Sequence, residues 1–201
     1  MKGLFKKISV SQVVILGFLA VIAAGSLLLS LPFASKDGQW TKYSDSLFTA
    51  VSSVCVTGLV VVDTATKWSF FGQFVIMLLI QIGGLGIITV VITIITFTHR
   101  KIGLHERAAI RDSLSLPQIG GVIRFVRFVL ATTLIIEAAG AIALSVAFIP
   151  DFGFFKGVWY GIFHSVSSFC NAGFDLMGEG APFSSLTAYS ANPLVNITVM
   201  F

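Results

Sequence analysis

Three apolar stretches, each long enough to cross a membrane, divide the chain; the first two carry no charge and the third carries one acidic residue. They cover residues 13–34, 68–98 and 128–149, which are 22, 31 and 22 residues long. A helix rises about 1.5 Å per residue and the hydrocarbon core of a bilayer is roughly 30 Å thick, so about 20 apolar residues cross it. We therefore expect three spans, with the first helix covering 10–34. A fourth apolar stretch starts at Asn192.

A short polar segment after the first span returns 115 residues later. Residues 47–59 and 162–174 align without a gap and are identical at 6 of 13 positions. The identical pairs are Phe48/Phe163, Val51/Val166, Ser52/Ser167, Ser53/Ser168, Cys55/Cys170 and Gly58/Gly173. Each copy is too polar and too short to cross a bilayer, yet apolar stretches flank it. The pattern predicts a re-entrant helix, over 43–54 in the first copy, that ends in a glycine turn.

The composition places the chain among integral membrane proteins. Hydrophobic residues make up 56% and charged residues only 11%, with a mean hydropathy of +0.95, far outside the range of soluble domains. The basic start at Lys2, Lys6 and Lys7 precedes an apolar run that is too long for a signal-peptide core, so we expect a retained first helix. The two cysteines occupy matching places without metal-ligand spacing, which indicates a duplicated packing position.

The order of elements predicts an all-α membrane protein built from tandem parallel repeats. Each repeat reads span, re-entrant helix, turn, span, so the chain returns to the same face and the copies share one orientation. The first repeat covers 1–98, a linker covers 99–116 and the second repeat covers 117–201. In the 115-residue period Phe201 corresponds to Gly86, so we expect the sequence to stop within the last span of the second repeat.

The glycine turns predict an ion pathway. Non-helical backbone at membrane depth is tolerated only inside protein or beside a watery cavity, and backbone carbonyls can replace the water of a permeant cation. Gly58 and Gly173 allow dihedral angles that aim successive carbonyls at one axis, and the first filter segment covers 55–60. Two turns do not enclose an ion whereas four can, so we infer two of four repeats. The alternative is a duplicated packing hairpin.

Serines accompany both predicted turns. The hydroxyl groups of four of them are expected to bond to backbone or helix-end groups behind the filter, not to ions. These are Ser52, Ser53, Ser167 and Ser168.

Three glycines interrupt the long span over 68–98. Gly83, Gly84 and Gly86 lower helix propensity and remove side-chain bulk. One interpretation is close packing of helices through small residues; the other is a hinge that belongs to a gate.

Basic residues predict the orientation. The N-terminus, the 99–116 linker and the start of the third span hold nine of the 13 Lys and Arg residues, so these segments are expected to be cytoplasmic and the re-entrant copies to face outward. The linker repeats residues at helical spacing and is predicted to be an amphipathic surface helix. It serves either as a topological loop or as a docking site for a soluble partner.

One acidic residue lies inside a span. An ionisable group such as Glu137 is expensive at that depth and is a functional candidate by default; the alternative is a carboxyl group that bonds to a neighbouring helix.

The sequence contains no motif that supports an enzyme. His99, His105 and His164 form no HExxH pattern, and no Gly-x-Ser-x-Gly elbow occurs. We expect no enzymatic activity.

Three motifs resemble the Trk/Ktr/HKT superfamily of potassium transporters, and most closely its KtrB type of pore-forming membrane subunit. They are SSVCVTGL at 52–59, QIGGLGI at 81–87 and SFCNAGF at 168–174. The resemblance covers all 201 residues and implies a pseudo-fourfold, K⁺-channel-like pore with one filter glycine per repeat. It places the ion-binding filter of this chain at Val56, Thr57, Gly58, Leu59, Asn171, Ala172, Gly173 and Phe174.

The same resemblance implies function and partners. It indicates selective K⁺ uptake across the cell membrane by a multi-pass homodimer, gated by a cytosolic ring of KtrA-like nucleotide-binding subunits. The nucleotide is expected on that partner only, with K⁺ as the permeant ion, no other metal or cofactor in this chain, and no nucleic acid. A serine at the first filter position is associated with sodium transport in plant relatives, so Gly58 favours K⁺. A Na⁺-transporting or proton-coupled cation transporter of the same architecture is the alternative.

Overall fold

The computed structural model describes residues 10–86 and 122–200. Within these ranges the chain forms helices and no strands, with one isolated antiparallel bridge between Ser35 and Trp68. The first half holds α1 (Val10–Ser30), η2 (Pro32–Ala34), α2 (Tyr43–Val54), α3 (Thr64–Lys67) and α4 (Phe70–Leu85). The second half holds α7 (Val122–Phe152), α8 (Phe154–Phe169), η3 (Thr187–Tyr189) and α9 (Pro193–Met200).

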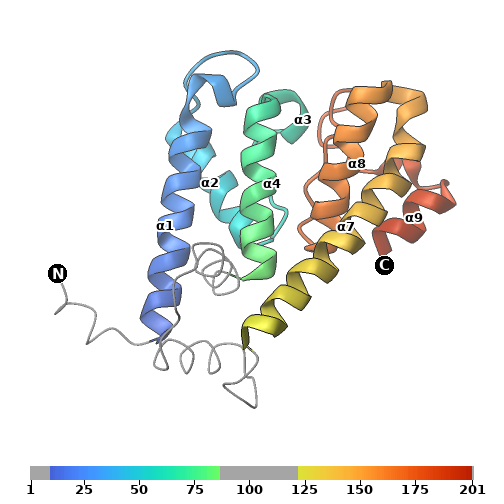
Figure 1. The fold of residues 1–201 in the computed structure, drawn as a ribbon. Coiled ribbons are helices and arrows are strands. Elements are labelled where there is room, and N and C mark those ends of the chain that lie inside the picture. Colours follow the sequence, from blue (N-terminus) through green and yellow to red (C-terminus); the bar gives the residue numbers. More distant parts are fainter. Residues whose placement is uncertain (1–9, 87–121, 201) are drawn as a thin grey trace.

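Helices α1, α2 and α4 pack together as one group (Figure 1). Small residues allow this close approach: a Cβ atom on Gly25 of α1 would lie 2.7 Å from a methyl carbon of Leu79 on α4. Trp68 and Ile76 are fully buried and belong to the hydrophobic core. Ser69 begins α4, because its side chain accepts a hydrogen bond from the Gly72 N–H, as N-terminal caps do.

Helices α7, α8 and α9 form the second group (Figure 1). A single residue, Gly153 with φ +78°, separates α7 from α8, a conformation that glycine adopts without steric cost. Gly157 and Gly161, one turn apart on α8, face α7 so closely that a Cβ atom on Gly157 would lie 2.7 Å from the Ile149 Cα. The two helices of the hairpin therefore pack through glycine.

Helix α4 joins the two groups by contacting α8. The Trp159 indole N–H donates to the Gln73 side-chain oxygen at 2.8 Å, and the Phe70 and Trp159 rings lie 4.3 Å apart between centroids. The first half of the chain is thus connected to the second through side chains of α4.

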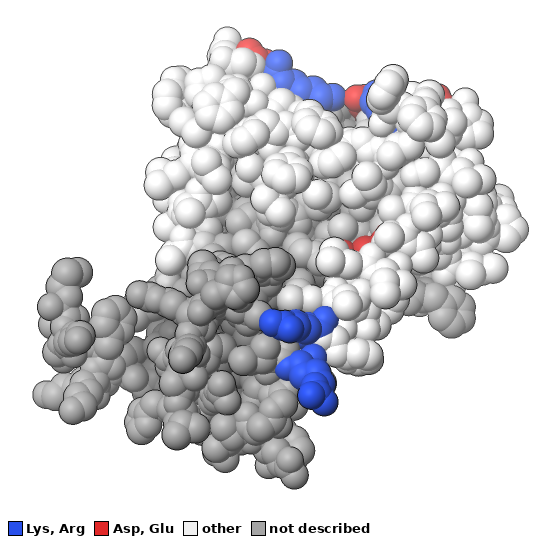
Figure 2. Space-filling model, viewed as in Figure 1, with Lys and Arg blue, Asp and Glu red and all other residues white. Residues whose placement is uncertain are grey.

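The outer surface of the helices is apolar. Among the described helices, residues 124–152 of α7 are long and apolar enough to cross a membrane, while 14–30 and 70–85 are shorter apolar helices. On the face in Figure 2, charged side chains gather at the two ends, with one acidic spot in the uncharged surface between them. Large apolar side chains more than half exposed include Ile15, Leu16, Leu19, Phe70, Leu134, Ile135 and Ile142.

Several helices differ in extent from the expected ranges. Helix α4 begins at Phe70 and ends at Leu85, because Gly86 adopts φ +78° there; the rest of 68–98, like the 99–116 linker and the N-terminus, lies outside the described residues. Helix α7 exceeds 128–149 and contains Pro150. A proline in the last turn forfeits one helical hydrogen bond yet leaves the Gly153 N–H bond to the Ile149 carbonyl, at 2.9 Å, intact.

Candidate functional site

Two turns with the same backbone geometry follow α2 and α8. We call residues 55–60 the first turn and residues 170–175 the second turn. Cys55 caps α2 at φ −83°, ψ −2° and Cys170 caps α8 at φ −76°, ψ −4°. The next residues, Val56 at φ +56° and Asn171 at φ +55°, both adopt the left-handed conformation. The backbone therefore reproduces the 115-residue repeat seen in the sequence.

The hydrogen bonds of the two turns match as well. The Val56 N–H donates to the Ser53 carbonyl at 3.3 Å and the Thr57 N–H to the Ser52 carbonyl at 3.0 Å. Their counterparts, from Asn171 to Ser168 and from Ala172 to Ser167, measure 2.9 and 2.7 Å. This pair of bonds is the Schellman motif that ends many helices, and it satisfies two of the carbonyl groups at the end of each helix.

Valine in the left-handed region is uncommon. A β-branched residue there is a genuine outlier, and such residues cost on the order of 1–3 kcal/mol unless the surrounding structure holds them. Val56 occupies this position although glycine or asparagine is the usual choice, and Asn171 occupies the matched position of the second turn. The first turn thus carries backbone strain that the second turn relieves with asparagine.

The two predicted filter glycines lie next to each other. Gly58 and Gly173 have φ +69° and +72°, and a Cβ atom on Gly58 would lie 3.3 Å from the Gly173 Cα and in severe contact with the Ala172 carbonyl oxygen. In return, a Cβ atom on Gly173 would lie 3.7 Å from the Gly58 Cα. The structure therefore brings the turns of the two halves into main-chain contact.

Serine hydroxyl groups support the turns from behind. Ser52 and Thr57 share a hydrogen bond of 2.9 Å between their hydroxyl oxygens, and Ser53 donates to the Thr49 carbonyl at 2.7 Å. Ser167 donates to the Phe174 carbonyl at 2.7 Å. Phe174, whose carbonyl is bonded in this way, is 2% exposed, whereas Leu59, its counterpart in the first turn, is 62% exposed.

His164 supports the second turn, and the sequence did not single it out for this role. Its side chain is 1% exposed; Nδ1 lies 2.7 Å from the Tyr160 carbonyl, and Nε2 accepts the Leu176 N–H at 3.2 Å. The only sign of this role in the sequence was a titratable residue inside a repeated, mostly apolar helix. The corresponding residue of the first half is Thr49.

Asp63 connects the loops that follow the two turns. Its carboxylate accepts hydrogen bonds from the Thr66 N–H and hydroxyl at 2.8 and 2.9 Å and from the Phe183 N–H at 2.8 Å. Gly178 packs directly on the carboxylate, leaving no space for a Cβ atom. Asp63 thus begins α3 and also fixes a loop of the other half, a role that sequence spacing alone did not reveal.

Polar side chains link α4, α7 and α8 inside the apolar region. The Gln81 side-chain amide donates to Glu137 Oε1 at 2.8 Å, and the Cys170 thiol contacts the Gln81 oxygen at 3.7 Å. Glu137 is 7% exposed and forms no ion pair with any described residue. This arrangement corresponds to one of the two alternatives for Glu137, a carboxyl group that bonds to a neighbouring helix. The other alternative was a functional ionisable group.

The glycines of α4 face the ends of the two short helices. A Cβ atom on Gly83 would collide with the Val54 carbonyl, and one on Gly84 would lie 2.5 Å from the Cys170 sulfur. Gly86 has φ +78°, and no atom of the described residues lies within 4 Å of a Cβ position there. Gly83 and Gly84 therefore pack helices, while Gly86 ends one. Whether Gly86 also serves as a hinge stays a prediction.

A charged cluster lies above the turns, at the α3 end. Glu179 pairs with Lys36 at 3.0 Å and also with Lys156 of α8, and Lys67 pairs with Asp37 at 3.0 Å. Partial burial acts to raise the pKa of Glu179, but the two ammonium groups outweigh it and lower that pKa below its ordinary value. Glu179 thus joins the first half to the second.

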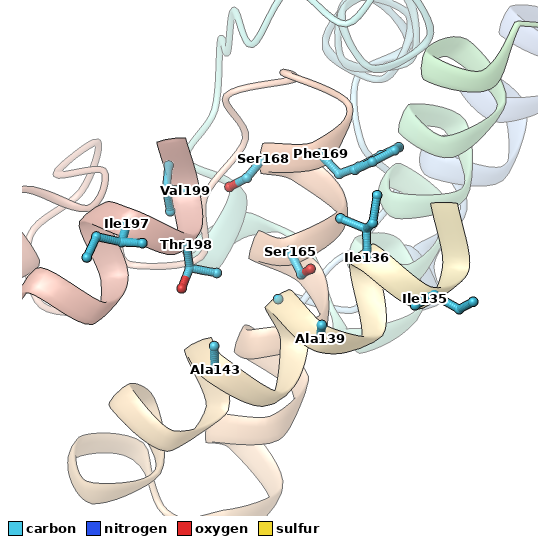
Figure 3. A pocket seen from close by; sticks show the side chains of 11 residues that line it. Ile135, Ile136, Ala139, Ala143, Ser165, Ser168, Phe169, Ile197, Thr198 and Val199 are labelled. Atoms are coloured by element: carbon cyan, nitrogen blue, oxygen red, sulfur yellow. The ribbon is translucent and has the colours of Figure 1, made fainter. Parts of the chain in front are cut away.

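A cavity of about 390 Å³ lies among α7, α8 and α9 (Figure 3). Its walls are mostly apolar, with Ile136 and Ala139 of α7 opposite Thr198 and Val199 of α9. The Ser165 hydroxyl lies beside it and donates to the Glu137 carbonyl at 2.7 Å. In the described parts of the chain, no three His, Cys, Asp or Glu side chains gather as a metal-binding group.

Comparison with known proteins identifies the relatives of this chain. A family model described as TrkH, a cation transport protein, matches residues 9–201. The potassium/sodium uptake protein NtpJ of Enterococcus hirae is 47% identical over 178 residues, which are 89% of this chain and 40% of that protein. The Ktr system potassium uptake protein B of Bacillus subtilis is 42% identical over 191 residues, 94% of this chain and 41% of that protein.

A more distant relative has the same coverage. The Ktr system potassium uptake protein B of Vibrio alginolyticus is 34% identical over 188 residues, 94% of this chain and 40% of that protein. The chain thus spans about two fifths of the length of these curated relatives.

Proposed function

Because the chain belongs to the TrkH family of cation transport proteins, we propose that it supplies two of four repeats of a membrane pore for K⁺ uptake. Each repeat contributes a span, a re-entrant helix, a turn and a second span. The first and second turns form half of a selectivity filter, and two further turns complete the ring.

The observation that carries this proposal is the contact between the two turns. Matched φ angles, matched hydrogen bonds and the proximity of Gly58 to Gly173 are all consistent with repeats arranged about one axis. A dehydrated cation needs oxygen ligands from several directions. Other carbonyl groups of the first and second turns supply these oxygens without a fixed charge that would trap the ion, whereas the Phe174 carbonyl already accepts the Ser167 hydroxyl.

The helices behind the turns favour a cation. Helices α2 and α8 both end at the turns, and the carboxyl end of a helix carries a partial negative charge. Their axes thus add an attractive potential beneath the filter. Nine basic residues near the N-terminus, the linker and the start of α7 favour an orientation with those segments in the cytoplasm and the turns toward the outside.

Relatives support K⁺ as the principal ion. Two of those compared above are named potassium uptake proteins and one a potassium/sodium uptake protein. The Ktr system names also support a multicomponent assembly, and we infer a homodimer gated by a cytosolic ring of nucleotide-binding subunits. Glu137 bonds to Gln81, which supports a role in helix packing over a role in proton coupling.

Ion flux through the complete protein in proteoliposomes tests the proposal. Wild-type protein should carry K⁺ faster than Na⁺, and Gly58→Ser should reduce that preference because its side chain meets the Ala172 carbonyl. Gly38→Ser is the matched control, since Gly38 also has a positive φ, +64°, but nothing within 4 Å of a Cβ position. Equal K⁺ preference in wild type and Gly58→Ser would show the filter assignment to be wrong, and equal wild-type flux of both ions would favour the Na⁺ alternative.

A further inference from the structure

We propose that His164 is a positioning residue for ion selection: it fixes the exit of the second turn by accepting the Leu176 N–H. This inference rests on the proposed filter function of the second turn. His164 does not contact the ion; it acts through the backbone that carries the filter carbonyl groups.

The hydrogen bonds of His164 determine its protonation. A backbone N–H can only donate, so the Nε2 atom that lies 3.2 Å from the Leu176 nitrogen must be unprotonated. A carbonyl can only accept, so the Nδ1 atom 2.7 Å from the Tyr160 oxygen must carry the proton. The imidazole is therefore neutral with both nitrogens used, and its orientation is set by two backbone groups.

Aromatic packing holds the imidazole in place. The Phe148 ring of α7 meets it edge-on with centroids 5.4 Å apart, and the rings of Tyr160 and Phe163 lie at 6.2 and 6.0 Å. The side chain is 1% exposed. A group packed on all sides transmits its position to whatever it binds, which here is the Leu176 backbone.

A second anchor lies one turn away on the same helix face. Ser167, three residues after His164, holds the Phe174 carbonyl at 2.7 Å, and residues three apart on a helix are neighbours. Ser167 therefore holds the second turn at Phe174, and His164 holds the chain two residues later at Leu176, just after the turn. Along the chain, Ala172 and Gly173 lie between the end of α8 and these two held residues.

The first turn lacks this double anchor. At the position equivalent to His164, the Thr49 hydroxyl donates to the Asp45 carbonyl within α2, at 2.8 Å. At the position equivalent to Ser167, the Ser52 hydroxyl bonds to the Thr57 side chain. The two halves therefore hold their turns differently, and the second turn is the more rigidly supported of the pair.

Substitutions of His164 test the role of its hydrogen-bond acceptor separately from the role of its ring size. His164→Phe keeps a ring but has no acceptor for the Leu176 N–H, while His164→Gln offers a side-chain oxygen near the Nε2 position. Loss of one neutral hydrogen bond should lower the K⁺ over Na⁺ flux ratio several-fold and by no more than about tenfold. The Gln variant should retain most of the wild-type ratio, and Thr49→Val is the matched control from the first half.

The flux assay uses the complete protein in proteoliposomes, with folding checked by size-exclusion chromatography. If His164→Phe does not fold, His164→Thr, which places the residue of the first half here, removes the acceptor with less bulk. A folded variant without the acceptor that keeps the wild-type ratio would overturn the inference, as would a His164→Gln ratio as low as that of His164→Phe. Wild-type protein without K⁺ preference would instead overturn the proposed function.

Discussion

The position that a Cβ atom of Gly58 would occupy faces the main-chain carbonyl oxygen of Ala172, across the boundary between the two halves of the chain. Gly58 also has φ +69°. Two separate requirements, one of conformation and one of space, therefore select glycine at this position. Only the conformational requirement was available from the sequence, because the identity of the neighbour across the boundary depends on the fold.

Gly58→Ala should destabilise the protein more than Gly38→Ala. A left-handed conformation costs about 1–2 kcal/mol in an alanine, and both positions incur it. At Gly58 the new methyl group also displaces the Ala172 carbonyl, which adds about 1–3 kcal/mol of overpacking. Thermal unfolding of the purified complete protein measures the difference, and equal losses in the two variants would contradict the contact.

The sequence predicted the extent of one short helix. Helix α2 covers 43–54, the range expected for the first re-entrant helix, and the Ser-Ser pair and the glycine recur at a fixed offset of 115 residues. These features depend on local hydropathy and turn chemistry, which a sequence displays directly. The re-entrant character of both short helices and the repeat architecture stay predictions.

The supports behind the turns were not predictable in the same way. His164 lies 12 residues before Leu176, Asp63 lies 120 residues before Phe183, and Gln81 lies 56 residues before Glu137. Such pairs depend on how helices pack, and a single sequence carries no periodic signal for them. Helix α7 extends beyond the expected 128–149 at both ends; at its carboxyl end Pro150 does not stop it, because a proline near the end of a helix costs only one bond.

Gly84→Ala and Gly86→Ala should separate helix packing from backbone conformation. An alanine at position 84 would place its Cβ atom 2.5 Å from the Cys170 sulfur, so we expect about 1–3 kcal/mol of destabilisation. Gly86 combines φ +78° with ψ 140°, close to a region that essentially only glycine adopts, so Gly86→Ala should cost on the order of 1–3 kcal/mol through backbone strain. If Gly86→Ala lowers ion flux more than Gly84→Ala does at an equal loss of stability, the hinge interpretation gains support; an unaltered unfolding temperature in Gly84→Ala would contradict the contact with Cys170.

The Gln81–Glu137 hydrogen bond should be worth about 0.6 kcal/mol and at most about 1.7 kcal/mol, the range for side-chain bonds between membrane helices. Glu137→Gln preserves an acceptor for the Gln81 amide and should leave stability and K⁺ flux nearly unchanged. Glu137→Leu removes it, and a double-mutant cycle with Gln81→Leu isolates the coupling between the two side chains. A K⁺ flux that needs a proton gradient and is lost in Glu137→Gln would instead indicate proton coupling.

Glu179 should make stability depend on pH at the acidic end. Its pKa is lowered from 4.5 in the folded protein, where Lys36 and Lys156 outweigh the opposing effect of partial burial. A carboxylate with a depressed pKa stabilises the fold above its unfolded pKa, and this contribution is lost as the pH falls through the folded value. The wild-type protein should therefore lose stability below about pH 4.5 by more than Glu179→Gln does, by no more than about 1 kcal/mol because the group is partly exposed. Unfolding measured between about pH 2.5 and 7 at low and high salt covers the window in which this contribution is lost, and salt should narrow the difference between the two proteins; identical pH profiles would show that Glu179 does not hold the two halves together.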